Sequence, residues 1–162
     1  MRFLSLAAAA GLLASLNGDS MSVMASPSKA QATTCSRNHH TSSRTQQKNF
    51  ENFIHRFYIE NDAVKAIEQT MSEDYIQHNP YALSGRQNAI DYVSSIVGAA
   101  NFTILRHSFS NSTGWVHTKM ETPGQPPAAV VDIFRFEGRC IVEHWDVFLS
   151  LPENAPNPLA LF

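Results

Sequence analysis

The stretch Val131-Asp132-Ile133-Phe134-Arg135-Phe136-Glu137-Gly138-Arg139-Cys140-Ile141-Val142-Glu143-His144-Trp145-Asp146 says more about the fold than any other part of this chain. Two runs of β-forming residues flank a Glu-Gly pair, a pattern that predicts a β-hairpin. Asp132, Glu143, His144 and Asp146 interrupt these apolar runs. Ionisable groups in a half-buried hairpin cost free energy unless they are hydrogen-bonded or face a wet pocket. The pattern therefore predicts a cavity lined by acids and a histidine.

The length of the hairpin turn decides which of these side chains meet. Successive side chains alternate between the faces of a strand, so His144 and Asp146 share one face. A two-residue turn at Glu137-Gly138 would place Asp132 opposite Glu143, whereas a three-residue turn would place it opposite His144. We favour the longer turn because it gathers Asp132, His144 and Asp146 on one face.

The rest of the chain predicts helices first and strands afterwards. An apolar stripe predicts a helix over 46–60, and cap signals predict two more helices, one ending near Met71 and one from Ser84 to Gly98. Alternating runs predict a short strand over 73–78 and longer ones over 102–109, 114–121, 128–136 and 139–149. This order predicts an α+β domain with helices on one face of a mostly antiparallel sheet.

Three short segments carry a family resemblance. Tyr75-Ile76-Gln77-His78-Asn79-Pro80, then Gly85-Arg86 opening a helix, and Glu143-His144-Trp145-Asp146 occur in an order that resembles the SnoaL-like polyketide cyclase family. That family belongs to the nuclear-transport-factor-2-like superfamily, and the resemblance covers residues 46–150. It implies a cone-shaped domain with about three amino-terminal helices and a strongly curved sheet. It also implies a homodimer formed through the open face of the sheet.

Length and composition allow one globular domain with tails. The chain has 162 residues, of which 43% are hydrophobic and 16% are charged, and its formal net charge is -2. This balance lacks the basic stripe expected of a nucleic-acid partner. No apolar span after the leader has the length of a transmembrane helix. Residues 151–162 form a proline-rich tail.

The amino-terminal segment predicts secretion. Arg2 precedes the apolar run Phe3–Leu16, which has the length of a secretory signal core. We expect a signal peptide over 1–25, with cleavage as late as residue 32, and a disordered arm over 26–45. A mitochondrial presequence is the alternative, but the scarcity of arginine argues against it.

In a secreted protein, two other features of the sequence could be modified covalently. Asn101-Phe102-Thr103 and Asn111-Ser112-Thr113 are N-glycosylation sequons. Cys35 and Cys140 are the only cysteines, so they form the one possible disulfide, which would tie the arm to the last hairpin. The alternative is that Cys35 is lost or free and Cys140 is buried as a small hydrophobic residue.

The candidate catalytic residues are Asp146, His144 and Asp132. An Asp-His-Asp cluster in apolar surroundings suits general acid–base chemistry. The resemblance implies that Asp146 is the acid/base, because the related cyclases use an acidic residue on their last strands. The alternative is that His144 and Asp146 satisfy each other as a structural pair.

Candidate substrate-binding residues are His78, Tyr75, His117 and Trp145, which lie at a strand end or on strands that could line a pocket. No metal is predicted, because His-x-His and His-Glu-x-x-His spacings are absent. Gly-rich phosphate loops and dinucleotide fingerprints are also absent, so no cofactor is predicted.

These observations lead to two hypotheses of function. The first is a cofactor-independent acid/base enzyme that cyclises, isomerises or dehydrates a hydrophobic, carbonyl-bearing small molecule. The second is a non-catalytic module of the same fold that binds a small apolar ligand or dimerises.

Overall fold

The computed structural model describes residues 35–37, 40–96, 98–157 and 159–162. They belong to a single compact unit, residues 32–162. The predicted signal peptide and most of the predicted arm lie outside the described residues. Among the described helices, none has the length and hydrophobicity that crossing a bilayer requires.

The helical layer differs from the prediction at both ends of its first helix. Helix α1, Ser43–Ile54, begins three residues early because the Ser42 hydroxyl caps it, accepting from the Thr45 amide at 3.2 Å. The predicted last turn is instead a π-helix, η1, His55–Ile59. Asn61, with φ of 56°, then redirects the chain. Helices α2, Ala63–Thr70, and α3, Arg86–Ile96, follow.

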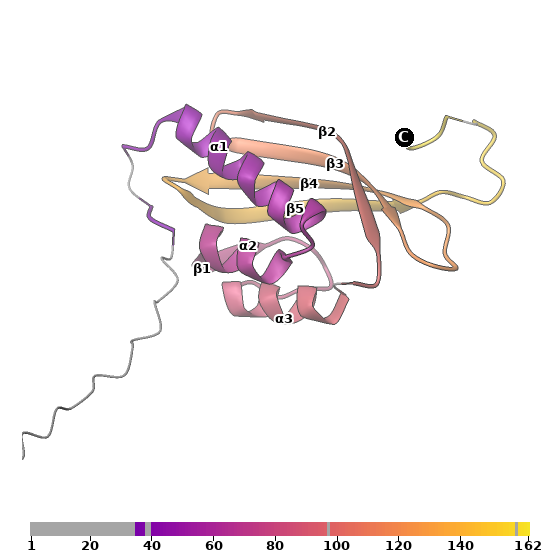
Figure 1. Ribbon diagram of the computed structural model, residues 1–162, viewed down its shortest axis with the longest axis horizontal. Helices are drawn as coiled ribbons and strands as arrows, with labels where there is room; N and C mark the ends of the chain where they lie inside the picture. The colour runs from indigo at the N-terminus through magenta and orange to yellow at the C-terminus, as the bar shows by residue number, and fades with distance from the viewer. Residues whose placement is uncertain (1–34, 38–39, 97, 158) are drawn as a thin grey trace, which may run out of the picture. The chain divides into compact units, whose positions relative to one another are not determined.

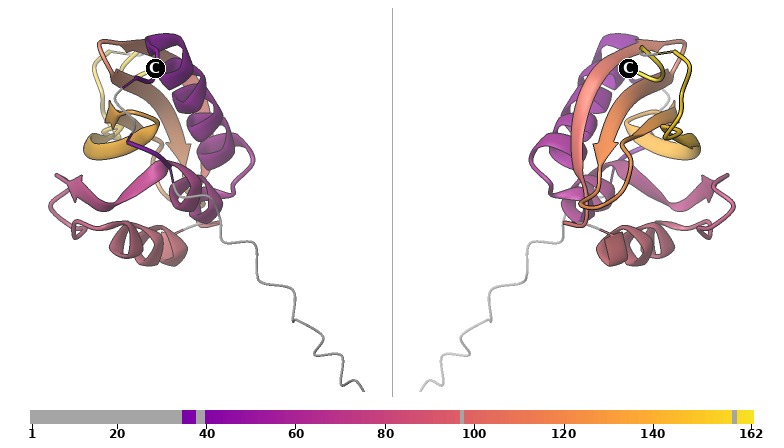
Figure 2. Two further views of the ribbon diagram at one scale, coloured as in Figure 1. Left: turned by 90° about the vertical axis from the view of Figure 1, so that its left-hand side faces the viewer. Right: turned by 90° about the vertical axis from the view of Figure 1, so that its right-hand side faces the viewer.

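The five strands form one sheet in the order β1-β5-β4-β3-β2 (Figure 1). They are β1 Met71–Gln77, β2 Asn101–Ser110, β3 Thr113–Glu121, β4 Ala128–Glu137 and β5 Cys140–Ser150. Only β1 is parallel to its neighbour, β5. The strands bend around one side of α1, while α2 and α3 lie next to β1 (Figure 2). The predicted α+β class with a curved, mostly antiparallel sheet is confirmed.

Both predicted hairpin registers are wrong. The turn is Gly138-Arg139, and an irregularity after Arg135 shifts the pairing so that Asp132 lies opposite Asp146. Gly138 has φ of 57°, a backbone conformation that favours glycine. The true register differs from the favoured one by an even number of residues. Asp132, His144 and Asp146 therefore still share one face.

Phe50 is the centre of the core between α1 and the sheet. Its side chain is fully buried and contacts the rings of Phe109, Phe134 and Phe136. Gly114 on β3 allows this approach, because a Cβ there would lie 2.6 Å from Phe50 Cδ2. The face of the sheet that packs on the helices is called the inner face below.

Thr118 introduces an unsatisfied polar group into this inner face. It is 0% exposed, and within the described residues its hydroxyl has no hydrogen-bond partner. Its cross-strand neighbours are Val130 and Ile104. We expect Thr118→Val to raise the free energy of unfolding by about 1 kcal/mol, because valine has the same shape without the desolvated hydroxyl. Urea denaturation of protein made without glycans measures this, with the exposed Thr103→Val as control; a less stable Thr118→Val would contradict it.

Candidate active site

The sheet brings the three candidate catalytic residues together on its inner face. Asp132 on β4 pairs with Asp146 on β5, and His144 lies two residues earlier on β5. One ligand-type atom from each residue lies within 4.8 Å of the others. Asp132 and His144 are buried, with 7% and 8% exposure, whereas Asp146 is half-buried.

Two tyrosines complete the buried part of this cluster. Tyr58 Oη, from η1, donates to Asp132 Oδ2 at 2.7 Å, and Tyr75 Oη, from β1, lies 3.2 Å from His144 Nδ1. Burial raises the pKa of Tyr58 well above its ordinary value, and the Asp132 charge adds to this. Burial, followed by the charges of Asp132 and Asp146, also raises the pKa of Tyr75. Both phenols therefore stay protonated, and Tyr58 donates to Asp132.

The hydrogen bonds of His144 define where its protons lie. Its Nδ1 is 3.1 Å from Gln77 Oε1, which also accepts from the amides of His78 and Asn79. Because Gln77 Oε1 is an acceptor, Nδ1 must carry a proton. His144 Nε2 is 2.9 Å from Asp132 Oδ1, so a single further proton lies between these two atoms. That proton can lie on either atom while the hydrogen bond is kept, whereas its removal from the pair would leave two acceptors facing each other.

Asp146 lies on the inner face with the other two residues, but it is the member of the cluster that is partly exposed to solvent. Asn79 Nδ2 donates to its Oδ2 at 2.6 Å, and no hydrogen bond recorded among the described residues engages its Oδ1. Further along the same face Phe148 is 55% exposed, and Val130 and Met120 are half-buried. An apolar surface open to solvent therefore adjoins the free carboxylate oxygen.

Aromatic rings pack around the buried members of the cluster. Phe134 stacks on His144 with ring centroids 4.6 Å apart, and the two tyrosines close the other sides. Asp132 and His144 are therefore buried, and Asp146 is the most exposed of the three residues. The acid-lined cavity stays a prediction.

The cluster also has the donor atoms of a metal site, which sequence spacing did not indicate. Asp132, His144 and Asp146 offer two carboxylates and one imidazole. Asp132 and His144 already bond to each other, and Asp132 also accepts from Tyr58. A cation would have to displace the proton between Asp132 and His144 and break their hydrogen bond. The residues therefore fit a shared proton better than a metal ion.

Three of the predicted substrate-binding residues lie away from the cluster. His78 stacks on Trp145, with centroids 4.7 Å apart and planes at 4°, and its Nε2 is 2.8 Å from Glu143 Oε1. Trp145 and His117 belong to the opposite, outer face of the sheet, because they alternate with His144 and Val116. Tyr75 is the only predicted substrate-binding residue that the fold brings to the cluster.

The outer face carries its own charge network, which makes stability depend on pH. Hydrogen bonds from His78, then Arg135, hold the pKa of Glu143 below its ordinary value. A depressed folded-state pKa contributes stability above the ordinary glutamate pKa that is lost as the pH falls through the folded value. We expect Glu143→Gln to lose about 1 kcal/mol at neutral pH and much of this acid dependence. Urea denaturation at neutral and acidic pH measures both; an unchanged pH slope would exclude Glu143 as its source.

Sequence analysis missed two functional contacts, those of Tyr58 and Asn79. Tyr58 lies within the predicted first helix over 46–60, and its side chain is 7% exposed. A tyrosine among phenylalanines is the signal that could have revealed it, since a buried hydroxyl needs a partner. Asn79 directly follows the predicted strand over 73–78, a position that does not indicate its contact with Asp146.

Residues 50–144 match the family model of the SnoaL-like domain. The chain belongs to the SnoaL-like family. No curated protein matches this SnoaL-like chain. Solved structures similar to it include a nuclear-transport-factor-2-like protein of unknown function from Burkholderia xenovorans, which is 18% identical with a TM-score of 0.58. That match covers 67% of this chain and 89% of the other.

Two further structures resemble this SnoaL-like domain. A candidate ketosteroid isomerase from Kribbella flavida is 12% identical, with a TM-score of 0.58 over 75% of this chain and 90% of that one. A candidate SnoaL-like polyketide cyclase from Jannaschia sp. CCS1 is 13% identical, with a TM-score of 0.53 over 64% and 87%. At these identities the likeness shows the fold alone.

Proposed function

We propose that this SnoaL-like domain is a cofactor-independent acid/base enzyme acting on a hydrophobic, carbonyl-bearing small molecule. The observation that carries this proposal is the half-buried Asp146, with one free carboxylate oxygen, directly opposite the buried Asp132–His144 pair. The apolar surface around Phe148 provides contact area for an apolar ligand. Similar folds named for ketosteroid isomerase and polyketide cyclase support the reaction class by analogy.

In the proposed reaction Asp146 removes a proton from the carbon next to the ligand's carbonyl. The C–H electron pair becomes an enolate, and Asp146 holds the proton. Returning the proton to another carbon gives isomerisation. If the enolate carbon attacks a second carbonyl of the same molecule, a C–C bond forms and the proton goes to the new alkoxide. Asn79 positions Asp146 through its hydrogen bond, and the buried Asp132–His144 pair sets the charge next to the Asp146 carboxylate.

Deuterium exchange tests this proposal without the natural substrate. We expect the wild-type protein to accelerate exchange of the α-protons of 2-tetralone in D2O, followed by NMR. Asp146→Asn should slow the catalysed exchange about a hundredfold or more, because asparagine cannot accept the proton. His117→Gln on the outer face is the matched control and should exchange like the wild type.

Two results would decide between the enzyme and the binding module. Catalysed exchange that Asp146→Asn abolishes, and that persists in EDTA, supports the acid/base enzyme. No exchange above buffer with 2-tetralone or related ketones, together with equal binding of 2-naphthol by both proteins, favours the non-catalytic binder.

Two features support a secretory location, which we also propose. Cys35 and Cys140 form a disulfide, a bond typical of oxidising compartments. The sequon residues Asn101 and Asn111 are exposed. Expression in a eukaryotic secretory host should give protein in the medium that loses mass on treatment with an N-glycosidase. Retention inside the cell without glycan would contradict this location.

Exposed apolar residues on the outer face support a homodimer. Trp115, Val147 and Leu149 are 37%, 62% and 53% exposed. Burying such a patch against a second copy would remove it from water. Sedimentation equilibrium at micromolar concentration should give twice the chain mass; a monomer would refute the proposal.

A further inference from the structure

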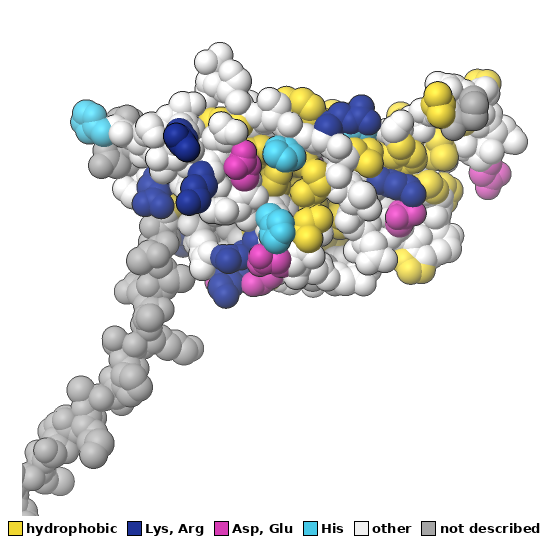
Figure 3. Space-filling view, turned by 45° about the horizontal axis from the view of Figure 1, so that its top comes forward, with side chains coloured by type: hydrophobic (Ala, Val, Ile, Leu, Met, Phe, Trp, Pro, Cys, Tyr) yellow, Lys and Arg dark blue, Asp and Glu magenta, His cyan; other side chains and the backbone are white. Residues whose placement is uncertain are grey.

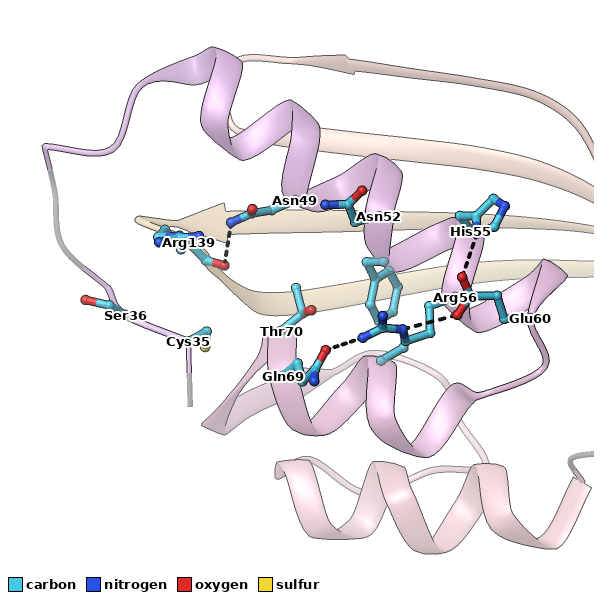
Figure 4. Close-up of a pocket in the computed structure, with 12 residues that line it drawn as sticks. Cys35, Ser36, Asn49, Asn52, His55, Arg56, Glu60, Gln69, Thr70 and Arg139 are labelled. Carbon is cyan, nitrogen blue, oxygen red and sulfur yellow. Dashed lines mark hydrogen bonds and ion pairs between the residues drawn. The ribbon is translucent and has the colours of Figure 1, made fainter. Parts of the chain in front are cut away.

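An open cavity lies apart from the acid cluster, between the helices and the last hairpin. Its volume is about 720 Å³, and Cys35, Ser36 and Arg139 form one wall (Figure 4). Asn49 and Asn52 project from α1, Gln69 and Thr70 from α2, and Arg56 lies between the two helices (Figure 4). None of the residues that line it belongs to the Asp132–His144–Asp146 cluster.

The lining of this cavity is polar. Of its apolar members, Phe53 and Ala66 are each only 2% exposed. The others are amides, hydroxyls and charged groups: Ser36, Asn49, Asn52, His55, Arg56, Glu60, Gln69, Thr70 and Arg139. Small-molecule sites are usually apolar with few polar anchors, so this one does not suit the apolar ligand proposed above. A volume within the range of such sites and a dense set of donors suit a hydroxyl-rich molecule.

Two guanidinium groups give the cavity its charge. Arg56 donates to Glu60 at 3.3 Å and to Gln69, and neither of these bonds uses its Nη2. No hydrogen bond or ion pair recorded among the described residues engages the Arg139 side chain. Glu60 is the only carboxylate in the lining. Besides its bond from Arg56, its Oε1 is 3.1 Å from His55 Nδ1. The lining therefore has an excess of positive charge, and Lys and Arg side chains also gather at the left of the face in Figure 3.

The wall that carries Arg139 is held in place before any ligand arrives. Gln46 donates to the Gly138 carbonyl at 2.9 Å, and Asn49 donates to the Arg139 carbonyl at 3.4 Å. The Arg139 amide donates to the Ser36 carbonyl at 2.8 Å. The Cys35–Cys140 disulfide joins the same two segments. A fixed backbone lowers the entropy that binding costs.

We propose that this cavity binds a small polyhydroxylated anion, a sugar acid or a sugar phosphate. The exposed Arg139 guanidinium would bind the carboxylate or phosphate, since arginine matches the geometry of both, and Arg56, at the other end of the lining (Figure 4), would donate its Nη2 to a ligand hydroxyl. The amides of Asn49, Asn52 and Gln69 and the hydroxyls of Ser36 and Thr70 would bind the ligand's hydroxyl groups.

Titration calorimetry with three probes tests the proposal. Glucuronate carries a carboxylate, glucose 6-phosphate carries a phosphate, and glucose carries neither group. We expect at least one anionic sugar to bind about tenfold or more tightly than glucose, because charge-assisted hydrogen bonds are the stronger ones. The tighter of the two identifies the anion as a carboxylate or a phosphate.

Variants assign that binding to the cavity. Arg139→Gln should weaken it about tenfold, whereas Arg44→Gln, an exposed arginine of α1 outside the lining, makes the same charge change and should not. Asp146→Asn should bind like the wild type, so failure here is distinct from failure of the proposed enzyme. Three results would overturn the proposal: no binding of either anion at millimolar concentration, equal binding of glucose, or equal effects of Arg139→Gln and Arg44→Gln.

Discussion

Asp132→Ala is expected to lower the free energy of unfolding by about 3–5 kcal/mol, the range found when one partner of a buried ion pair is removed. Asp132 is 7% exposed and is bonded to both His144 and Tyr58. Alanine would leave the Tyr58 hydroxyl and His144 Nε2 buried without partners and would open a small cavity. Denaturant unfolding followed by circular dichroism measures the loss.

Asp132→Asn is the control that separates the hydrogen bonds from the charge. Its carbonyl can accept from Tyr58, and its amide can donate to an unprotonated His144 Nε2. Histidine in that tautomer keeps the Nδ1 proton that Gln77 Oε1 requires. We therefore expect Asp132→Asn to lose about 1 kcal/mol. If alanine and asparagine cost the same, the charge of Asp132 is the stabilising feature rather than its hydrogen bonds.

Breaking the Cys35–Cys140 disulfide is expected to cost about 4 kcal/mol. The bond joins residues separated by 105 positions, and closing so long a loop removes much of the entropy of the unfolded chain. Cys140 is 1% exposed, so its thiol can remain buried as a small apolar group. We expect Cys35→Ala to unfold at clearly lower denaturant concentration than the oxidised wild type.

Reduction of the wild type provides the matched comparison for this variant. It breaks the same covalent bond without changing any side chain. Reduced wild type and Cys35→Ala should therefore have free energies of unfolding that agree within about 0.5 kcal/mol. If reduction leaves the midpoint unchanged, the disulfide does not constrain the unfolded chain as we propose.

Local sequence patterns predicted the elements well because periodicity and turn residues act over short distances. The apolar stripe of α1 and the alternation of β3 and β4 reappear as buried faces. The hairpin register failed because no single residue indicates the irregularity after Arg135. The prediction that Asp132 shares a face with His144 and Asp146 is still correct, because the error in the hairpin register is an even number of residues and so leaves each side chain on its predicted face.

The candidate site was harder to predict because its contacts join distant segments. Tyr58 and Asp132 are 74 positions apart, and Asn79 and Asp146 are 67 apart. The π-helix changes the rotation of the chain just before Tyr58, which the spacing of apolar residues did not indicate. His78 and Trp145 were predicted to line a pocket from a strand end and a strand, whereas alternation along β5 places Trp145 on the outer face and His78 stacks on it there.

The strand order has a consequence for how the domain is made on the ribosome. β1 lies at one end of the sheet and pairs only with β5, the last strand in the chain (Figure 1). During synthesis β1 must therefore wait for its hydrogen-bonding partner until the helices and the other strands have emerged. A nascent chain stalled before Cys140 would present β1 with both edges open, a form suited to capture by chaperones or to pairing with a neighbouring chain.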